Sequence, residues 1–323
     1  GAPEASVQPP VVVRRVLPDV RRDASSAAWL ASRARTYWLR DSVRRRALRE
    51  QHFDLVHYHY PNRFTDTTRA PTRPWVLSVH DVRPHSPRLG RLEVPLLRLL
   101  YSRPDALVVH HPLLAEQLQD EFGVAQDRIF VVPHQVFPVI DPVPLPKQPQ
   151  ATVLFFGALR DNKGLDVFAE AVATADRDRF RFQIAGRGSD RMERLAMSLA
   201  ETYDNVDAEI GYVSTARKAE LFHEATIVAM PYTTFNSQSG VLHDAYGHGR
   251  PVVVTDVGAL GQTVREDGTG IVVPPGDATA VLAALETIAS APEVFAAAAR
   301  QIALDRDPEH TGLRLRAVYD HLL

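Results

Sequence analysis

The sequence predicts an α/β fold with two doubly wound domains, each built on a parallel sheet. Short, continuously apolar runs rich in β-branched residues alternate with longer stretches of helical pattern, which is typical of parallel strands covered on both faces. A proline-rich stretch over residues 138–150 interrupts this alternation, and neither a helix nor a central strand suits it. We therefore expect a boundary near residue 145, with domains over residues 1–145 and 146–323.

The expected strands divide unequally between the two domains. Those before the proline-rich stretch are Phe53–Tyr58, Trp75–His80, Ala106–His110 and Ile129–Pro133. Those after it are Val153–Gly157, Phe182–Gly186, Thr226–Pro231, Pro251–Thr255 and Gly270–Val273. Even with a further strand over residues 11–16, the first domain is the smaller, so we expect it to lack an initial strand, loop and helix. Residues 1–10 are expected to form a loop.

Composition excludes several classes of function. The chain has 323 residues, 45% hydrophobic and 24% charged, which suits two globular cores. It contains no cysteine, which excludes disulfides, thiolate nucleophiles and cysteine-ligated metal centres. A formal net charge of −2 provides no general attraction for nucleic acid. No apolar run is long enough to span a membrane and no signal-peptide pattern begins the chain, so we expect a cytoplasmic protein.

Basic residues are concentrated near the N-terminus. Residues 14–49 contain eleven arginines and three aspartates. One interpretation is a solvated helix face; the other is peripheral contact with an anionic membrane inner face or with a phosphorylated acceptor. Lysine, by contrast, occurs only at positions 147, 163 and 218, which indicates GC-rich coding of the kind found in actinobacteria. Because this coding bias favours arginine over lysine, each remaining lysine is a candidate for a specific functional role.

Histidines follow the expected strands of the first domain. They are His57, His59, His80, His85, His110, His111 and His134. Ligands bind beyond the carboxyl ends of strands in open α/β sheets, so these histidines are candidate site residues, although each is also explained by ordinary packing or solvation. His57 and His59 would point to opposite faces of a strand, and no third ligand has a convincing spacing. We therefore expect no metal site.

A loop near the start of the second domain has the composition of an anion site. Gly157 ends a strand, and Arg160 and Lys163 follow ahead of a helix. Cationic side chains and a helix N-terminus together suit a phosphate group, whereas the alternative is an ordinary basic surface loop. The next strand ends in Gly186-Arg187-Gly188, where the glycines alone indicate only a turn.

The most informative segment runs from Pro231 to Leu260. A strand ends at its start, a polar loop follows, and a helix is expected to begin near residues 239–241. Small residues at a helix start leave backbone N–H groups accessible to an anion such as a diphosphate. Asp244 lies about one turn into this helix. Its carboxylate suits ribose hydroxyls, and the alternative role is to complement the helix dipole.

Taken together, these segments resemble the retaining glycosyltransferases of family 4 (glycosyltransferase group 1). The second half carries the resemblance through FFGALRDNKG, IAGRG, NVDAEIGYVS, VAMPYTTFNSQSGVLHDAYGHGRPVVVTDVGAL and GIVVPPGD, in this order. The first half matches more loosely through FDLVHYHYP, PWVLSVHD, DALVVHH and RIFVVPH. The resemblance implies the GT-B fold, in which two Rossmann-like domains face a cleft. The first would bind the acceptor and the second the nucleotide sugar, with the last helix crossing back to the first domain.

The resemblance also implies roles for individual residues. Arg160 and Lys163 would bind the donor diphosphate, and His80 would face the transferred sugar. The other donor-binding residues would be Gly157, Gly186, Arg187, Asn236, Ser239, Gly240, Val241, Leu242 and Asp244. The acceptor side would hold His59, Tyr60 and His110. No cofactor or metal is implied, because cationic side chains and a helix N-terminus neutralise the leaving diphosphate. The co-substrate would be a UDP- or GDP-sugar, and the acceptor a small molecule or a glycan.

One departure from the family pattern concerns two glutamates separated by seven residues, whose positions hold Asn236 and Asp244 here. A subgroup with the Gln-Ser-Gly-Val pattern also lacks the first carboxylate. Retention would then depend on a front-face mechanism without a protein nucleophile.

The alternative function is a non-catalytic GT-B subunit that binds a nucleotide sugar. A sugar epimerase or phosphorylase is less favoured, because their acidic or cofactor-binding signatures are absent. The sugar, the base, the acceptor and the oligomeric state are not determined by the sequence.

Overall fold

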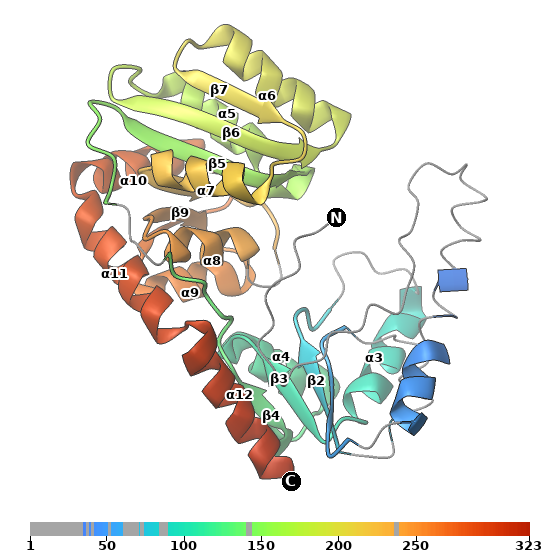
Figure 1. Cartoon of the computed structure of the whole chain (residues 1–323). Helices are drawn as coiled ribbons and strands as arrows, with labels where there is room; N and C mark the ends of the chain where they lie inside the picture. Colours follow the sequence, from blue (N-terminus) through green and yellow to red (C-terminus); the bar gives the residue numbers. More distant parts are fainter. Residues whose placement is uncertain are drawn as a thin grey trace.

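The computed structural model describes residues 35–36, 39, 42–50, 53–60, 71, 74–83, 90–139, 144–235 and 239–323. The expected strand over residues 11–16, the loop over residues 1–10, His85 and Asn236 lie outside these described residues. Figure 1 shows two α/β domains, with the first sheet in the lower half and the second in the upper half. All strand pairs in both sheets are parallel, so the predicted fold class is confirmed.

The first sheet has four strands in the order β1-β2-β3-β4. They are β1 (Val56–Tyr58), β2 (Trp75–Val79), β3 (Ala106–Val109) and β4 (Ile129–Val131). Helices α3 (Glu93–Tyr101) and α4 (Pro112–Phe122) cover one face and share a core with Leu77 and Leu107. The neighbouring strand residues, Val76 and Val108, face the other side, because side chains alternate along a strand.

The second sheet has six strands in the order β10-β9-β8-β5-β6-β7. They are β5 (Ala151–Leu159), β6 (Phe180–Gly188), β7 (Val206–Ile210), β8 (Ile227–Met230), β9 (Val252–Thr255) and β10 (Gly270–Val273). The chain winds from β5 to β6 and β7 on one side, and then returns to β8, β9 and β10 on the other. The strand order therefore reverses between β5 and β8, which is where doubly wound sheets bind ligands.

Helices cover both faces of the second sheet. They are α5 (Leu165–Thr174), α6 (Asp190–Thr202), α7 (Thr215–Glu224), α8 (Gly240–Gly247), α9 (Gly258–Asp267), α10 (Ala278–Ser290) and α11 (Pro292–Asp305). Phe155 of β5 packs with α5, α6 and α10, whereas its neighbour Leu154 packs with α7, α8, α9 and α11. Among the described residues no single helix is long and apolar enough to cross a membrane. The pair α10 and α11 passes that criterion together and is bent by 89°.

Strand β7 is the element that the apolar pattern did not predict. Its residues alternate between more and less buried positions from Val206 to Ile210, and it pairs only with β6. An edge strand with one covered face shows alternation, whereas the other strands were indicated by continuous apolar runs. Strands β5 and β6 are also longer at both ends than the apolar runs indicated.

The two domains are joined twice. Residues 144–150 lead from the first sheet into β5, and α12 (Pro308–Leu322) returns from α11 to the first sheet. Figure 1 shows α11 and α12 running along both domains, and Val318 of α12 packs against Val76 and Val108. Helix α12 therefore covers the face of the first sheet that α3 and α4 leave open. The precise domain boundary near residue 145 stays a prediction.

Candidate functional site

The candidate site lies at the reversal of strand order in the second sheet. The loop after β5 (residues 160–164) and the segment after β8 (residues 231–235) leave the carboxyl ends of adjacent parallel strands. Hydrogen bonds join the two loops: the Thr233 amide donates to the Asn162 carbonyl at 3.1 Å, and the Asn162 side-chain amide donates to the Thr234 carbonyl at 3.2 Å. These contacts fix Lys163 beside the second loop.

Gly164 is a position where the two loops approach closely. Its φ of +72° is in the left-handed region, and a Cβ at this position would collide with the carbonyl oxygen of Pro231. Glycine is therefore required for two reasons, the backbone conformation and the absence of space. The same applies to Gly186 of β6, whose φ is +149° and whose Cβ would collide with the Gly157 carbonyl oxygen.

Replacing Gly164 with alanine is expected to lower the free energy of unfolding by about 2–4 kcal/mol, since a left-handed conformation and overpacking both contribute. The matched control is Gly268→Ala. Gly268 also has a left-handed φ, +64°, but no atom lies within 4 Å of its added Cβ. This control is expected to lose only about 1 kcal/mol. Urea unfolding of both variants measures the difference, and equal losses would show that the loop contact is unimportant.

Lys163 is held by two aromatic rings. Its Nζ lies 3.6 Å from the ring centroid of Tyr232 and 4.2 Å from that of Phe235. Burial, with a smaller contribution from the charge of Arg160, lowers the pKa of Lys163 to about 8. Burial also raises the pKa of Tyr232 to about 12, so its hydroxyl keeps its proton at neutral pH. The result is a preorganised cation at the ligand-binding edge of the sheet.

The N-terminus of α8 completes this edge. The hydroxyls of Tyr232 and Ser239 hydrogen-bond at 2.9 Å, and no side chain among the described residues caps the helix. Ser239 and Leu242 are buried, whereas Gly240 is exposed. An uncapped helix start presents free N–H groups and the positive end of the helix dipole. Gly157 lies against it, since a Cβ there would be 3.3 Å from Val241 Cγ2.

Asp244 does not stand alone on α8. Its Oδ1 accepts a hydrogen bond from Lys218 Nζ of α7 at 2.7 Å, and the two side chains are each 31% exposed. The sequence interpretation did not predict this pair, although the scarcity of lysine singled out Lys218. Arg187 is the penultimate residue of β6, which pairs with β5 on the side opposite β8. Its side chain is exposed, and it is in register with Ala158.

The first domain brings its predicted histidines together. The ring centroids of His80 and His110 lie 4.9 Å apart, and Tyr60 stacks on His80 at 5.0 Å. His59 is exposed and packs on His57, which hydrogen-bonds Ser78 and Tyr319 of α12. Burial lowers the pKa of His80 and lowers that of His110 to about 4, so both rings are neutral at pH 7.

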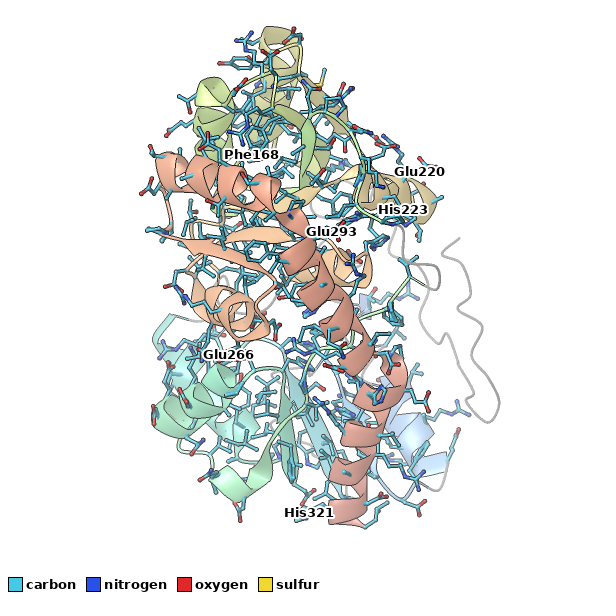
Figure 2. The ribbon with its side chains drawn as sticks, turned by 90° about the vertical axis from the view of Figure 1, so that its left-hand side faces the viewer. Phe168, Glu220, His223, Glu266, Glu293 and His321 are labelled. Atoms are coloured by element: carbon cyan, nitrogen blue, oxygen red, sulfur yellow. The ribbon has the colours of Figure 1, made fainter. Side chains whose placement is uncertain are left out.

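Two further histidines connect this group to the second domain. His134, after β4, stacks on His243 of α8 with ring centroids 4.6 Å apart, and also contacts His110 at 4.7 Å. His243 is buried, and burial lowers its pKa well below the usual value. A second contact between the domains is the His111–Glu266 pair, whose nearest atoms are 3.6 Å apart; Glu266 is labelled in Figure 2. The histidines of the first domain and helix α8 of the second domain therefore meet at one interface.

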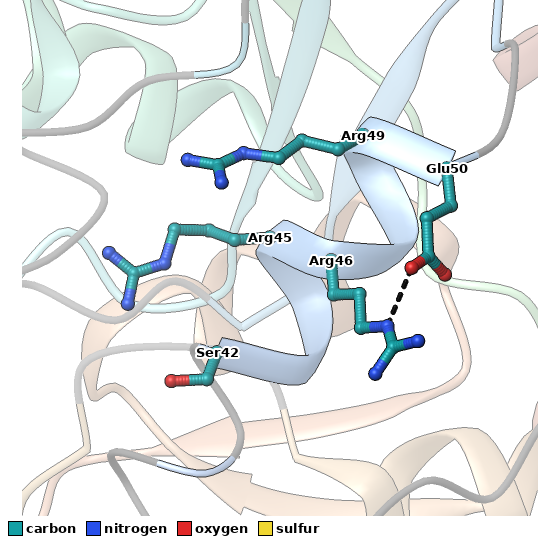
Figure 3. A pocket seen from close by; sticks show the side chains of 5 residues that line it. All are labelled: Ser42, Arg45, Arg46, Arg49 and Glu50. Carbon is teal, nitrogen blue, oxygen red and sulfur yellow. Dashed lines mark hydrogen bonds and ion pairs between the residues drawn. The ribbon is translucent and has the colours of Figure 1, made fainter.

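The described part of the arginine-rich segment forms a helix over residues 42–50. Figure 3 shows a surface pocket on it, lined by Ser42, Arg45, Arg46, Arg49 and Glu50. Arg46 pairs with Glu50 at 2.6 Å, and the pair is well exposed. Contact with an anionic membrane or a phosphorylated acceptor stays a prediction.

Comparison with known protein families tests the resemblance in both halves. The family model described as glycosyl transferases group 1 matches residues 150–291, and the model described as Glycosyltransferase Family 4 matches residues 2–136. The chain belongs to the family 4 (group 1) glycosyltransferases. The resemblance stated from the sequence is therefore confirmed.

Individual glycosyltransferases are similar at low identity. The O-antigen chain mannosyltransferase C of Escherichia coli is 25% identical over 248 residues, which cover 73% of this chain and 66% of the relative. The D-inositol 3-phosphate glycosyltransferase of Geodermatophilus obscurus is 26% identical over 308 residues, which cover 83% of this chain and 66% of the relative. This glycosyltransferase chain thus spans about two thirds of the length of both relatives.

Solved structures agree on the fold. Anabaena Alr3699/HepE in complex with UDP superposes with a TM-score of 0.71 at 16% identity, covering 88% of this chain and 82% of that one. A sucrose-phosphate synthase from Thermosynechococcus elongatus gives a TM-score of 0.70 at 19% identity, covering 91% and 78%. The glycosyltransferase chain therefore has the GT-B fold of these structures.

Proposed function

We propose that the chain transfers a sugar from a nucleoside diphosphate to an acceptor hydroxyl, with retention of anomeric configuration and without a metal at the diphosphate. The observation that carries this proposal is the position of Lys163, held over Tyr232 and Phe235 beside the uncapped start of α8. A fixed ammonium group and free helix amides stabilise the charge that develops on a leaving diphosphate.

The remaining donor contacts follow from this placement. Arg160 provides a second cation for the diphosphate, and Gly157 and Gly186 let the chain approach the donor without a side chain. Asp244 accepts hydrogen bonds from the ribose hydroxyls, and Lys218 keeps its carboxylate oriented. Arg187, exposed at the end of β6, borders the nucleoside side of the donor.

The names of the similar structures support a nucleotide-sugar donor. Anabaena Alr3699/HepE was crystallised with UDP, with UDP and glucose, and with UDP-glucose. The curated relatives include a mannosyltransferase and D-inositol 3-phosphate glycosyltransferases. We infer that the donor of this chain is a UDP- or GDP-hexose and that the acceptor is a small molecule or a glycan.

Retention is explained by a front-face transfer. The bond between the anomeric carbon and the diphosphate oxygen breaks, and its electron pair stays on the leaving nucleoside diphosphate. The acceptor oxygen attacks the same face, and its proton passes to the departing phosphate oxygen. The neutral ring of His80 orients the sugar by hydrogen bonding, while His59, Tyr60 and His110 surround the acceptor. No protein nucleophile is needed, which agrees with asparagine at position 236.

The test is donor turnover in EDTA. The full chain is incubated with UDP- and GDP-hexoses, release of the nucleoside diphosphate is followed, and the anomeric configuration of any product is determined by NMR. Turnover that persists in EDTA and yields the donor's anomer supports the proposal. An inverted product would refute retention. Tight donor binding without turnover or hydrolysis, in a chain supplied with acceptors, would instead identify a binding subunit.

The affinity for UDP is expected to fall as the pH rises above 8. Lys163 has a pKa of about 8 in the free protein, and a bound diphosphate favours its protonated form. Above pH 8 the free protein loses the proton that the complex keeps, so the dissociation constant rises up to about tenfold per pH unit. The phosphates themselves are already ionised above about pH 7.

The control for this pH dependence is Lys163→Arg, because arginine stays charged over the whole range. Calorimetric titration of both proteins with UDP between pH 7 and 9.5 is the measurement. A flat profile for the arginine variant and a rising dissociation constant for the natural protein are expected. The same slope in both proteins would assign the titration to another group.

A further inference from the structure

Three histidines at the domain interface have the arrangement of a metal site. His80, His110 and His134 follow β2, β3 and β4, which are adjacent parallel strands whose carboxyl ends share one edge. One ring nitrogen from each lies within 4.8 Å of the others. We propose that these three imidazoles bind one divalent transition-metal ion of the zinc class.

The backbone orients all three rings for this role. His110 Nδ1 lies 2.9 Å from the Val132 carbonyl oxygen. His80 hydrogen-bonds the backbone of His59, and His134 that of Gln135. A carbonyl only accepts, so the ring nitrogen facing it carries the proton and the opposite nitrogen presents its lone pair. Histidines that bind metals nearly always donate their second nitrogen in this way.

The chemistry of the three ring nitrogens selects the class of cation. Imidazole nitrogens select zinc, cobalt, nickel or copper, whereas magnesium and calcium require oxygen ligands. The selected class is therefore a borderline cation rather than the magnesium that accompanies many nucleotides.

The required movement is small. Zinc–nitrogen bonds of about 2.0–2.1 Å place tetrahedral ligands about 3.3 Å apart. The ring nitrogens now lie up to 4.8 Å apart, so each separation has to shorten by about 1.5 Å at most. Three protein ligands leave a fourth position for water or an exogenous group.

Metal binding would have a consequence for transfer, and this step rests on the proposed function. A cation on the nitrogen of His80 removes that nitrogen from contact with the donor sugar. The site would therefore be inhibitory, with zinc raising the apparent KM for the donor. It is distinct from the diphosphate site around Lys163, where no metal is proposed.

The test uses cobalt as a spectroscopic probe. Tag-free full chain is treated with EDTA, dialysed and titrated with CoCl2, and the visible d–d absorption is recorded. One equivalent with the intense absorption of a tetrahedral or five-coordinate site, displaced by ZnCl2, supports the proposal. Only the weak absorption of octahedral aquo-cobalt, without saturation at one equivalent, overturns it. This readout needs no donor, so it is independent of the transferase assay.

His134→Phe and His243→Phe form a matched pair, because the two rings stack on each other and phenylalanine preserves the stacking. Only His134 belongs to the three ligands. His134→Phe is expected to weaken cobalt binding at least about 100-fold, since even outer-shell partners of metal ligands contribute about 10–100-fold. His243→Phe is expected to bind as the natural protein does. Equal binding by both variants, with unchanged thermal melts, would overturn the assignment.

Discussion

Replacing Lys163 with alanine is expected to weaken UDP binding about 10- to 100-fold, because a charge-assisted contact to phosphate contributes about 1.5–3 kcal/mol. The substitution removes the ammonium group that Tyr232 and Phe235 hold in place. Arg160 and the amides of α8 remain, so binding is reduced and not abolished. Calorimetric titration with UDP in EDTA is the direct measurement, and GDP serves to compare the bases.

The control for this experiment is Lys147→Ala. Lys147 is exposed on the segment between the two sheets. Replacing it with alanine removes the same charge from a chain that has only three lysines. Its UDP affinity should match that of the natural protein. If both alanine variants lose affinity equally, net charge and not a local contact controls binding. If neither does, the diphosphate binds elsewhere and the proposed donor site is wrong.

The loop that we propose binds the donor could be singled out from the sequence because its signals are local. A glycine after an apolar strand, two cations and a helix start within eight residues are enough to indicate an anion site. The contacts of Lys163 with the rings of Tyr232 and Phe235 could not be predicted from the sequence, because these two residues follow a different strand. Only the sheet order, with β8 beside β5, brings them to Lys163.

Contacts between distant elements account for what the sequence did not reveal. Lys218 and Asp244 are on different helices, and nothing in their spacing indicates a pair. The third histidine of the metal candidate, His134, is brought near His80 and His110 by the parallel pairing of β3 with β4. His57 and His59 are close in sequence but do not belong to this candidate, whose three nitrogens follow three neighbouring strands. Parallel sheets gather such residues at one edge regardless of their separation along the chain.

The second large effect concerns the junction of α11 and α12. Arg306 forms a bidentate pair with Asp267 at 2.5 and 2.9 Å, with side chains 18% and 4% exposed. Its carbonyl also accepts the Val136 amide at 2.7 Å, which ties this junction to the chain following the first sheet. Burial raises the pKa of Asp267, and the Arg306 charge and the Tyr246 hydroxyl oppose that shift.

Replacing Arg306 with leucine is expected to lower the free energy of unfolding by about 3–5 kcal/mol, because it leaves the Asp267 carboxylate buried without its cation. The loss should shrink as the pH falls. Without Arg306 the pKa of Asp267 in the folded state rises further above its unfolded value, so the folded state takes up a proton first and gains stability on acidification. Urea unfolding at pH 7.5 and 5.5 measures both effects.

A pair of the same geometry on the surface provides the control. Arg265 and Asp256 are also bidentate, at 2.6 and 2.9 Å, but their side chains are 51% and 50% exposed. Arg265→Leu is expected to lose at most about 1 kcal/mol, since water screens exposed pairs. Burial is the difference between the two ion pairs to which we would attribute this contrast. A similar loss in both variants, without the pH dependence for Arg306→Leu, would show that Asp267 is stabilised by its other contacts and that the junction does not depend on this ion pair.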